Sequence, residues 1–523
     1  MRGLAMNLVK RHAPPAQRVA LAHARQWGAA WCLLAAMAAL AQPSAPRVLP
    51  FFPPEVQVIE PLPVAVRITP IDPTTEAPAQ VLVAALKAGR SVTLCNVDIN
   101  MTGISQVELN AGQSIRAQEG CERSSARRGP RIYVTDKRDG GVALFILRDS
   151  NTALSGFRLE GPNPGIGSGT QNREYGIQVA PQGDSTPPAS GTQTHLLHDV
   201  RINNMEVFHW SGAGIDLADN QAVHPQGRMT LDNAAGVTVA DNYIHHNRHY
   251  AGFGYGVNVG KGAYALVRGN VFEQNRHAMA GDSVSDDKRD HSGYVFQDNL
   301  ILPGGGLHCR EGTFRICWQT HQIDIHGTQS NLTKGQHCCG TAGETVLIER
   351  NTILYRGGYR TVKTGPTPRE HWAWGLAIKI RGNPKGRARV DGNVFALPNK
   401  GSAIAQNGDG ALGQNITNPV QVTQNNLWDA RPMDTLKPCD FDGDGANDDF
   451  MATGVSWWVR SAATQQWRFL STKTETMGTL VLQDMNGDGQ CDVALKPRRP
   501  GMTPQHYSAH GTGPWQAVPL VVQ

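Results

Sequence analysis

One short pattern recurs along the chain and constrains its fold more than any other feature. Two alternating apolar residues are followed by an asparagine and one more apolar residue, as in Val237, Val239, Asn242 and Ile244. The alternation predicts a strand, and the asparagine after it predicts a turn. Intervals of 28 and 29 residues, then longer ones, indicate one repeated unit with loops of differing length. The repeated asparagines are Asn242, Asn270, Asn299, Asn351, Asn393 and Asn425.

Asparagines stacked at strand spacing can share side-chain amide hydrogen bonds along the stack. With these repeats the chain resembles the right-handed parallel β-helix superfamily of pectate lyases, polygalacturonases and related secreted proteins, over about residues 90 to 430. We therefore predict an all-β protein: a right-handed parallel β-helix solenoid with an N-terminal helical cap and a small C-terminal calcium-binding β appendage. The resemblance is to a fold that carries many functions, so it does not specify a reaction.

The composition divides the chain into four regions. Residues 1–41 hold five basic and no acidic residues and end with Ala39 and Ala41 in a cleavage pattern, which predicts a signal peptide and a protein secreted to the periplasm or beyond. The alternative is an uncleaved anchor. We expect a Pro-rich linker at 42–78, the solenoid at 79–430 with a cap helix at 79–89, and the appendage at 431–523. No segment after residue 41 is long and apolar enough to predict a membrane span.

Charge and cysteine content narrow the partner classes. Removing the five N-terminal basic residues from the 49 in the chain leaves 44, equal to the 44 acidic residues, without a basic cluster. A nucleic-acid partner is therefore not expected. Eight cysteines follow residue 41, and an even number in an exported protein predicts disulfides. We expect the pairs Cys95–Cys121 and Cys439–Cys491 and two further disulfides among Cys309, Cys317, Cys338 and Cys339, with metal binding as the less favoured alternative.

A second type of strand lies between the asparagine turns and defines a candidate groove. If its Ile, Val and Met residues point inward, period-2 alternation directs two columns of residues outward. A third column, two residues earlier in each strand, is almost all Gly and Ala, and we expect it to form a trough. The first column is Gln178, Asp216, Asn258, Ala280, Asp324 and Lys379, and the second is Ala180, Ala218, Gly260, Asp282, His326 and Arg381.

Two copies of an Asn-Arg-His motif precede these strands. Their offset of 28 residues predicts that His249 stacks over His277 and Arg248 over Arg276. These residues are either a proton carrier and substrate clamps or a hydrogen-bonded corner of the solenoid. The nearby aromatic residues, which either stack on sugar rings or only pack, include Tyr255 and Trp374.

Hydrolysis of a glycosidic bond is the first chemistry that fits the groove. Two carboxyl groups would act as acid and base, and Asp282 and Asp324 on adjacent strands would lie about 8 Å apart. His326 would tune one of them, while Lys379 and Arg381 would hold a substrate carboxylate. The third candidate carboxylate is Asp216.

Elimination and simple binding are the alternatives. In a β-elimination, Lys379, Arg381 or a calcium ion on Asp216 and Asn258 would neutralise a uronate carboxylate. The base that removes the proton next to that carboxylate would be His326, His277 or Tyr255. In the third reading nothing reacts, and the groove is the surface of a lectin or adhesin. All three readings name a polysaccharide or other glycan as the partner.

The appendage carries two similar acidic loops. Each places oxygen-bearing side chains at positions 1, 3, 5 and 9 and glycine at position 6, a pattern that suits calcium. The loops resemble the FG-GAP, or VCBS, repeats of calcium-binding propeller proteins, and this resemblance implies Ca²⁺ as a structural ion. The expected ligands are Asp440, Asp442, Asp444 and Asp448 in the first loop and Asp484, Asn486, Asp488 and Asp492 in the second.

Overall fold

A computed structural model describes most of the chain beyond residue 66. The chain divides into two compact units, Met1–Pro61 and Leu62–Gln523, and the first lies outside the described residues, together with the predicted signal peptide. None of the helices among the described residues is both long and apolar enough to cross a membrane. The described ranges are 67–137, 141–163, 174–180, 197–217, 236–249, 253–260, 263–282, 292–310, 316–327, 340–355, 376–407, 416–499 and 501–518.

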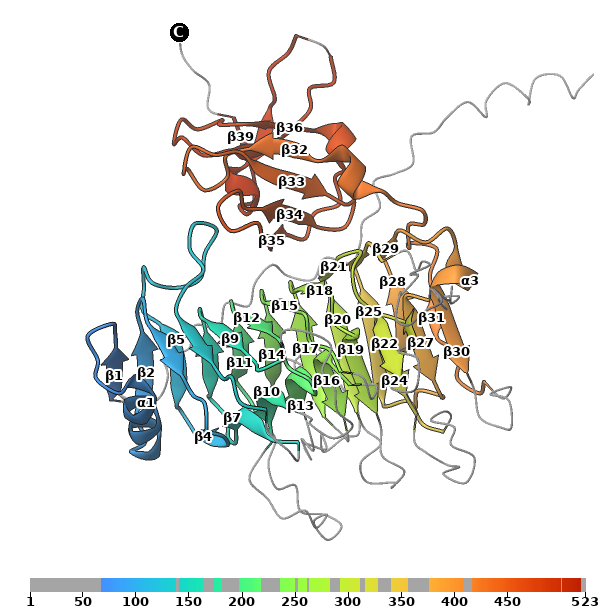
Figure 1. Ribbon diagram of the computed structural model, residues 1–523. Helices are drawn as coiled ribbons and strands as arrows, with labels where there is room; N and C mark the ends of the chain where they lie inside the picture. Colours follow the sequence, from blue (N-terminus) through green and yellow to red (C-terminus); the bar gives the residue numbers. More distant parts are fainter. Residues whose placement is uncertain are drawn as a thin grey trace, which may run out of the picture. The chain divides into compact units, whose positions relative to one another are not determined.

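Three long parallel sheets form the solenoid, and each coil of the chain adds one strand to each sheet (Figure 1). Apolar side chains from all three sheets fill the interior as one continuous core. This arrangement is the parallel β-helix predicted from the asparagine repeat.

The first sheet, here sheet 1, contains the strands that precede the asparagine turns. Its first strand pairs with the strand after the cap helix, so the solenoid begins inside the stretch predicted as a linker, and the boundary at residue 79 was wrong. In order, sheet 1 consists of β1 (Ile68–Ile71), β2 (Ser91–Leu94), β5 (Ser114–Ala117), β8 (Ala153–Ser155), β11 (Val200–Asn203), β14 (Val237–Ala240), β17 (Tyr264–Arg268), β20 (Gly293–Gln297), β25 (Thr345–Glu349), β28 (Ala388–Asp391) and β31 (Gln421–Val422).

Sheet 2 carries the predicted groove residues. Its strands in order are β4 (Val107–Leu109), β7 (Ala143–Leu147), β10 (Tyr175–Val179), β13 (Ala213–Leu217), β16 (Tyr255–Gly260), β19 (His277–Asp282), β24 (Ile323–His326), β27 (Ile378–Arg381) and β30 (Ile404–Asn407). A hairpin of β22 (Leu307–Arg310) and β23 (Ile316–Gln319) precedes β24, with Cys309 and Cys317 paired in the backbone register. The predicted disulfides of Cys338 and Cys339 lie outside the described residues, as do the side chains of Cys309 and Cys317.

Sheet 3 follows the asparagine turns and consists of short strands. They are β3 (Asp98–Asn100), β6 (Arg131–Tyr133), β9 (Arg158–Glu160), β12 (Glu206–Phe208), β15 (Tyr243–His245), β18 (Val271–Glu273), β21 (Leu300–Ile301), β26 (Thr352–Ile353) and β29 (Val394–Phe395). A further helix, α3 (Lys400–Ala403), comes after β29 and is capped by Asn399.

The predicted asparagine ladder is present at the corner between sheets 1 and 3. Asn351 shows the pattern: its Oδ1 accepts from the backbone N–H and Nδ2 of Asn299, and its Nδ2 donates to Asn393. The last rung is Asn426, which accepts from Asn393, and not Asn425 as predicted. Asn425 instead donates to the carboxylate of Asp391.

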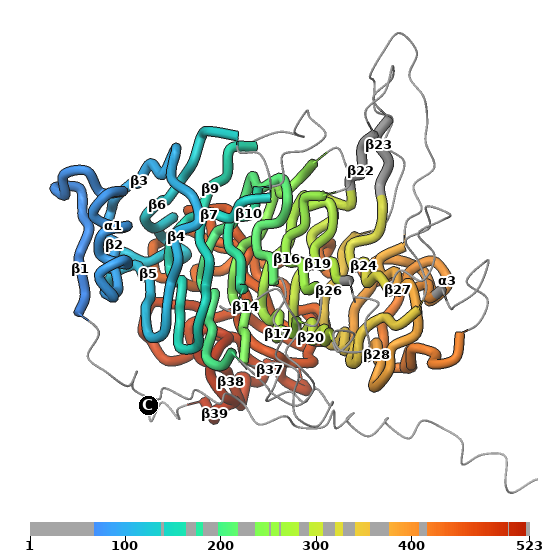
Figure 2. The backbone as a smooth tube through the Cα atoms, turned by 90° about the horizontal axis from the view of Figure 1, so that it is seen from below, coloured from blue at the N-terminus to red at the C-terminus, as the bar shows by residue number. Residues whose placement is uncertain are grey.

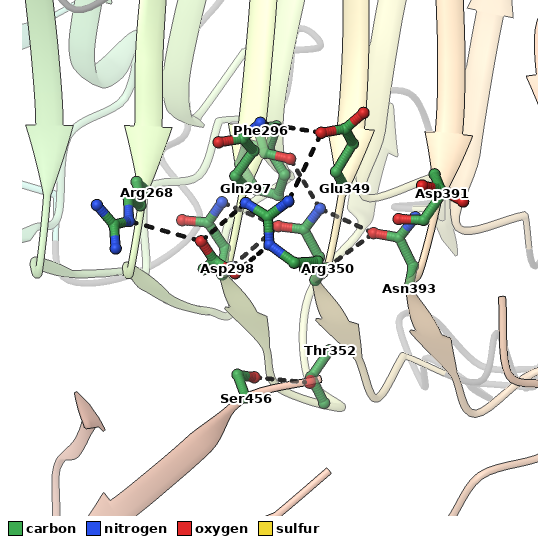
Figure 3. A network of polar contacts seen from close by, with 12 residues as sticks. Arg268, Phe296, Gln297, Asp298, Glu349, Arg350, Thr352, Asp391, Asn393 and Ser456 are labelled. Atoms are coloured by element: carbon green, nitrogen blue, oxygen red, sulfur yellow. Dashed lines mark hydrogen bonds and ion pairs between the residues drawn. The ribbon is translucent and has the colours of Figure 1, made fainter. Parts of the chain in front are cut away.

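Charged side chains lie outside this ladder and join neighbouring coils (Figure 3). The buried Asp298 carboxylate accepts from Arg350 Nε at 2.9 Å and lies 3.5 Å from Arg268 Nε. Gln297 Nε2 donates to Glu349 at 3.1 Å. Successive coils are thus joined by side-chain bonds as well as by the backbone ladder.

A helix and a disulfide lie at the N-terminal end of the solenoid. Helix α1 (Pro78–Lys87) buries Leu82 and Leu86 in the solenoid core, and Gln113 donates to the carbonyl of Leu86. Cys95 and Cys121 form a disulfide, as predicted.

The C-terminal region forms two four-stranded antiparallel sheets. Cys439 and Cys491 form the predicted disulfide between them, and Phe450, Trp457 and Val493 lie in their shared core. Short 3-10 helices occur at η2 (Pro432–Thr435), η3 (Met477–Thr479) and η4 (Ala509–Gly511). The strands are β32 (Lys437–Cys439), β33 (Asp448–Ala452), β34 (Trp457–Arg460) and β35 (Trp467–Ser471), then β36 (Leu480–Gln483), β37 (Asp492–Leu495), β38 (His506–Ser508) and β39 (Trp515–Ala517).

The C-terminal region packs on the outer side of sheet 3. Arg123 donates to Gln466 at 2.9 Å, and Thr352 donates to Thr453 at 2.9 Å. A buried apolar cluster joins the same two regions. Its solenoid members are Val271, Leu300, Leu302 and Leu354, and its C-terminal members are Met451, Trp458 and Trp467. The C-terminal region thus contacts sheet 3, whereas the predicted groove residues lie on sheet 2.

Candidate functional site

The predicted outward columns lie on neighbouring strands of sheet 2, and Figure 2 shows β16, β19, β24 and β27 side by side. Asp324 is paired in register with Ala280 on one side and Lys379 on the other. In the second column His326 lies between Asp282 and Arg381. The adjacency of the Asp282 and Asp324 strands is therefore as predicted. The side chain of Asp282 is outside the described residues, and so is Trp374.

The predicted trough of small residues is wrong, because this column faces the core. A Cβ on Gly176 would lie 2.9 Å from the Trp210 ring nitrogen, and one on Gly256 would lie 2.9 Å from the Phe272 ring. Both aromatic side chains are buried in the solenoid. Glycine is needed in these positions because the core aromatics occupy the space that a side chain would fill.

The side chain of Asp324 is the centre of a buried polar cluster on this face. Its Oδ1 accepts from Arg381 Nε at 2.8 Å, and its Oδ2 accepts from Arg381 Nη2 at 2.9 Å. The same Oδ2 lies 2.8 Å from His326 Nε2, 3.0 Å from His321 Nε2 and 3.4 Å from His277 Nε2. The predicted residues Asp324, His326, His277 and Arg381 therefore meet at one carboxylate.

His321 was missed by the sequence reasoning. At the entrance of each strand two successive residues face inward, as Ala278 and Met279 do, both with no exposed surface. In the strand of Asp324, the outward residue before this inward pair is therefore His321, three positions before Asp324. Strict alternation had instead selected Gln322, two positions before Asp324. The signal was the shared spacing of Tyr255-x-x-Asn258, His277-x-x-Ala280 and His321-x-x-Asp324.

The rings on this extra column stack along the solenoid. Tyr255 stacks on His277 at 5.7 Å between ring centroids, and His277 stacks on His321 at 5.0 Å. His277 Nδ1 donates to the backbone carbonyl of His321. The Arg276 guanidinium lies 5.4 Å from the centre of the Tyr255 ring, so this predicted clamp residue packs on an aromatic face.

The electrostatics of the cluster follow from its burial. Asp324 is 1% exposed, which by itself raises the pKa of a carboxyl, but the charges of His326 and His321 and their hydrogen bonds hold the pKa of Asp324 well below its ordinary value. Burial lowers the pKa of His277 well below the ordinary value, and the charge of Arg276 adds to this effect. Burial also lowers the pKa of His321. The cluster thus favours the ionised form of Asp324, and burial favours the neutral forms of His277 and His321.

Asp216 belongs to a separate group. Its carboxylate accepts from Gln178 Nε2 at 3.1 Å and from Asn258 Nδ2 at 2.7 Å, and it is 4% exposed. Three strand steps of about 4.8 Å separate its strand from that of Asp324, or about 14 Å. Asp216 and Asp324 therefore cannot act on the same bond.

The predicted stacking of the Asn-Arg-His motifs holds only for the asparagines. Asn247 donates to Asn275 at 2.8 Å, but the residue paired with His277 is Tyr255 and not His249. Tyr255 follows His249 by six residues in the chain, and residues 250–252 between them lie outside the described residues. His249 is buried beside Phe253, at 6.1 Å between ring centroids.

The acidic loops of the C-terminal region share one backbone geometry. Asp440 accepts from the N–H groups of Gly443 and Gly445 at 2.7 and 2.9 Å, and Asp484 accepts from the equivalent glycines at 2.7 and 3.0 Å. The ninth residues, Asp448 and Asp492, are buried and each accept an N–H from within their own loop.

The two loops differ in how their carboxylates meet. In the first loop, oxygens of Asp440, Asp442 and Asp444 lie within 4.8 Å of one another, which suits a hard cation. In the second loop, Asp488 is bonded to Asn486 Nδ2 at 2.9 Å and lies 2.7 Å from His510 Nε2.

Comparisons with known proteins add little to this geometry. No protein-family profile and no curated protein matches the chain. Among solved structures, the Dettilon tailspike protein (gp208) is 11% identical, with a TM-score of 0.26 over 75% of this chain and 78% of that one. ORF18 of Geobacillus virus E2 is 11% identical, with a TM-score of 0.32 over 86% of this chain and 84% of that one. The fold therefore rests on the strand registers described above.

Proposed function

We propose that this protein binds an acidic polysaccharide on the outer face of β24 and β27 and cleaves it by β-elimination. The supporting observation is the pairing of a buried ionised carboxylate with a partly exposed imidazole. Asp324 Oδ2 lies 2.8 Å from His326 Nε2, and the His326 side chain is 29% exposed. A buried carboxylate that orients a histidine in this way is a common support for a general base.

Hydrolysis by paired carboxyl groups is less well supported. A general acid must carry a proton near neutral pH, which requires a raised pKa. The pKa of Asp324 is lowered, and both of its oxygens accept from Arg381. Asp216 is about 14 Å away by strand spacing and is held by two amide groups. Elimination needs only one base and one cationic clamp, which Asp324 and its neighbours can support.

The proposed reaction assigns one role to each group. Lys379 and Arg381 neutralise the substrate carboxylate, which makes the proton on the adjacent ring carbon more acidic. His326 takes that proton, the electron pair forms a carbon–carbon double bond, and the bond to the leaving glycosidic oxygen breaks. The leaving oxygen then takes up a proton. The products are an unsaturated uronide and a new reducing end.

An activity assay with three readings tests this proposal. The protein is incubated with uronate polymers such as pectate and alginate and with neutral glycans, while reducing ends, unsaturated-uronide absorbance and binding are followed. We expect reducing ends and absorbance together on a uronate polymer. His326→Gln should lower turnover by roughly 10²- to 10⁴-fold, whereas His198→Gln, at an exposed histidine outside sheet 2, should not.

Other outcomes overturn the proposal in distinguishable ways. Reducing ends without absorbance would indicate hydrolysis, with Asp282 the next residue to test. Glycan binding without either product would indicate a lectin or adhesin. A His326→Gln variant with full turnover would place the base elsewhere.

We also propose that the two acidic loops bind calcium as a structural ion. The matching backbone bonds of Asp440 and Asp484 and the converging carboxylates of the first loop support it. Ca²⁺ at 100 times its Kd should stabilise the C-terminal region by about 2.7 kcal/mol. Asp440→Asn should reduce this stabilisation in a thermal melt, whereas Asp449→Asn, at a carboxylate paired with Arg460, should not.

Export is part of the same proposal. Residues 1–41 carry the basic and apolar pattern of a signal peptide. The disulfides Cys95–Cys121 and Cys439–Cys491 favour an oxidising compartment. Sequencing the N-terminus of the secreted protein is the test, with residue 42 expected first.

A further inference from the structure

His277 is a buried side chain that the proposed elimination does not use. Its Nδ1 donates to the carbonyl of His321, so in the neutral ring Nε2 carries a lone pair and no proton. His277 Nε2 is fully buried and has no hydrogen-bond partner among the described residues. It lies 3.4 Å from Asp324 Oδ2, which also carries lone pairs. Two facing acceptors repel each other unless a cation lies between them.

Two further donors converge on the same point. His321 Nε2 lies 3.0 Å from Asp324 Oδ2, and single donor atoms of His277, His321 and Asp324 all lie within 4.8 Å of one another. We propose that His277, His321 and Asp324 bind a divalent transition-metal ion of the zinc type. Two imidazoles and a carboxylate are typical ligands for such ions.

The surrounding contacts match the outer shell of such a site. Metal-bound histidines usually donate their other ring nitrogen to a carbonyl or carboxylate, as His277 does to the carbonyl of His321. Asp324 Oδ1 accepts from Arg381 Nε at 2.8 Å, which holds the carboxylate so that Oδ2 faces the imidazoles.

Two cations compete with the metal for this position. Arg381 Nη2 lies 3.0 Å from His321 Nε2 and must release that nitrogen when the ion binds. A proton on His277 Nε2 would also relieve the repulsion. A metal ion between His277 Nε2 and Asp324 Oδ2 would also bind the third donor, His321 Nε2, which a proton on His277 would not do.

The inference concerns the site of the proposed function but does not depend on its reaction, and its test uses no glycan. The full protein is stripped with a chelator and titrated with Co²⁺ in excess Ca²⁺, which keeps the C-terminal carboxylates occupied. We expect one equivalent of Co²⁺ with visible d–d absorption. His321→Gln and His277→Gln should weaken binding at least 100-fold, whereas His198→Gln should not change it.

A folding control distinguishes loss of the metal site from loss of structure. The His321 side chain is 12% exposed, so His321→Gln is the variant more able to fold, and its circular dichroism is compared with that of the wild-type protein. Absence of stoichiometric Co²⁺ binding would overturn the proposal. So would Co²⁺ binding that a folded His321→Gln variant retains. A protein that binds Co²⁺ but forms no unsaturated uronide would remove the proposed function and leave the metal site.

Discussion

Asn351→Ala tests whether the asparagine ladder stabilises the solenoid. Asn351 is fully buried and makes four side-chain bonds: it accepts from the Asn299 backbone N–H and Nδ2 at 3.0 Å each, and donates to the Phe296 carbonyl at 2.8 Å and to Asn393 Oδ1 at 2.9 Å. After the substitution Asn299 Nδ2 still donates to a carbonyl and Asn393 Oδ1 still accepts the backbone N–H of residue 351. The Asn299 backbone N–H loses its partner in the ladder.

The expected cost follows from this inventory. One buried N–H left without an acceptor costs about 1–3 kcal/mol, and each of the three other lost bonds costs about 0.5–1.5 kcal/mol. The sum is about 2.5–7.5 kcal/mol, large for a single substitution. Asn425→Ala is the matched control, because Asn425 lies outside the ladder and donates to Asp391 at 3.1 Å; its loss should cost about 1 kcal/mol.

The assay is urea unfolding followed by circular dichroism, because the strands of the solenoid dominate that signal. Asn351→Ala should shift the midpoint clearly more than Asn425→Ala. An Asn351→Ala variant within 1 kcal/mol of wild type would show that the ladder does not stabilise the coils. Equal costs for the two variants would refute the assignment of the last rung to Asn426.

Three other predictions concern the pH dependence, the core and the C-terminal disulfide. Burial raises the pKa of Glu206, but the hydrogen bond and charge of His245 lower it from 4.5 to about 2; stability present above pH 4.5 should be lost as the pH falls toward 2, and Glu206→Gln should flatten this loss in acid-unfolding curves. An acid-unfolding curve that Glu206→Gln leaves unchanged would contradict this role of Glu206. Gly281→Ala should cost about 1–3 kcal/mol, because its Cβ would lie 2.2 Å from a core tyrosine ring, whereas Gly478→Ala, with nothing within 4 Å, should be neutral in the same urea assay. Cys491→Ser opens a disulfide spanning 52 residues and should destabilise the C-terminal region by about 2–4 kcal/mol in thermal melts; an unchanged melt would mean that the two sheets hold together without it.

The architecture could be predicted because each copy of the asparagine repeat corresponds to one coil of the solenoid. Residues such as Asn270 and Asn299 recur in the sequence wherever a coil passes the same corner. The error at the last rung arose because Asn425 and Asn426 are adjacent and the spacing does not distinguish them. The N-terminal boundary was missed because β1, within a Pro-rich stretch, belongs to the solenoid only through its pairing with β2.

The site could be predicted only in part, for a reason of backbone geometry. Alternation from the inward isoleucines correctly placed Asp324, His326 and Arg381 on one face. It failed at the strand entrances, where two successive residues turn inward, and so it selected Gln322 and missed His321. It also assigned the small residues to the surface, because the sequence does not reveal that Phe272 and other core aromatics need their space.

That same irregularity gives this face its chemistry. With strict alternation, the outward residue before Asp324 would be Gln322, and a neutral amide would lie beside the carboxylate. The double inward step instead brings His321 to 3.0 Å from Asp324 and stacks it on His277, so that two imidazoles and one carboxylate converge. Arg381 Nε donates to this carboxylate at 2.8 Å and fixes its orientation. A solenoid built for regular stacking thus holds a buried cluster of titratable side chains where its strands depart from the period of two.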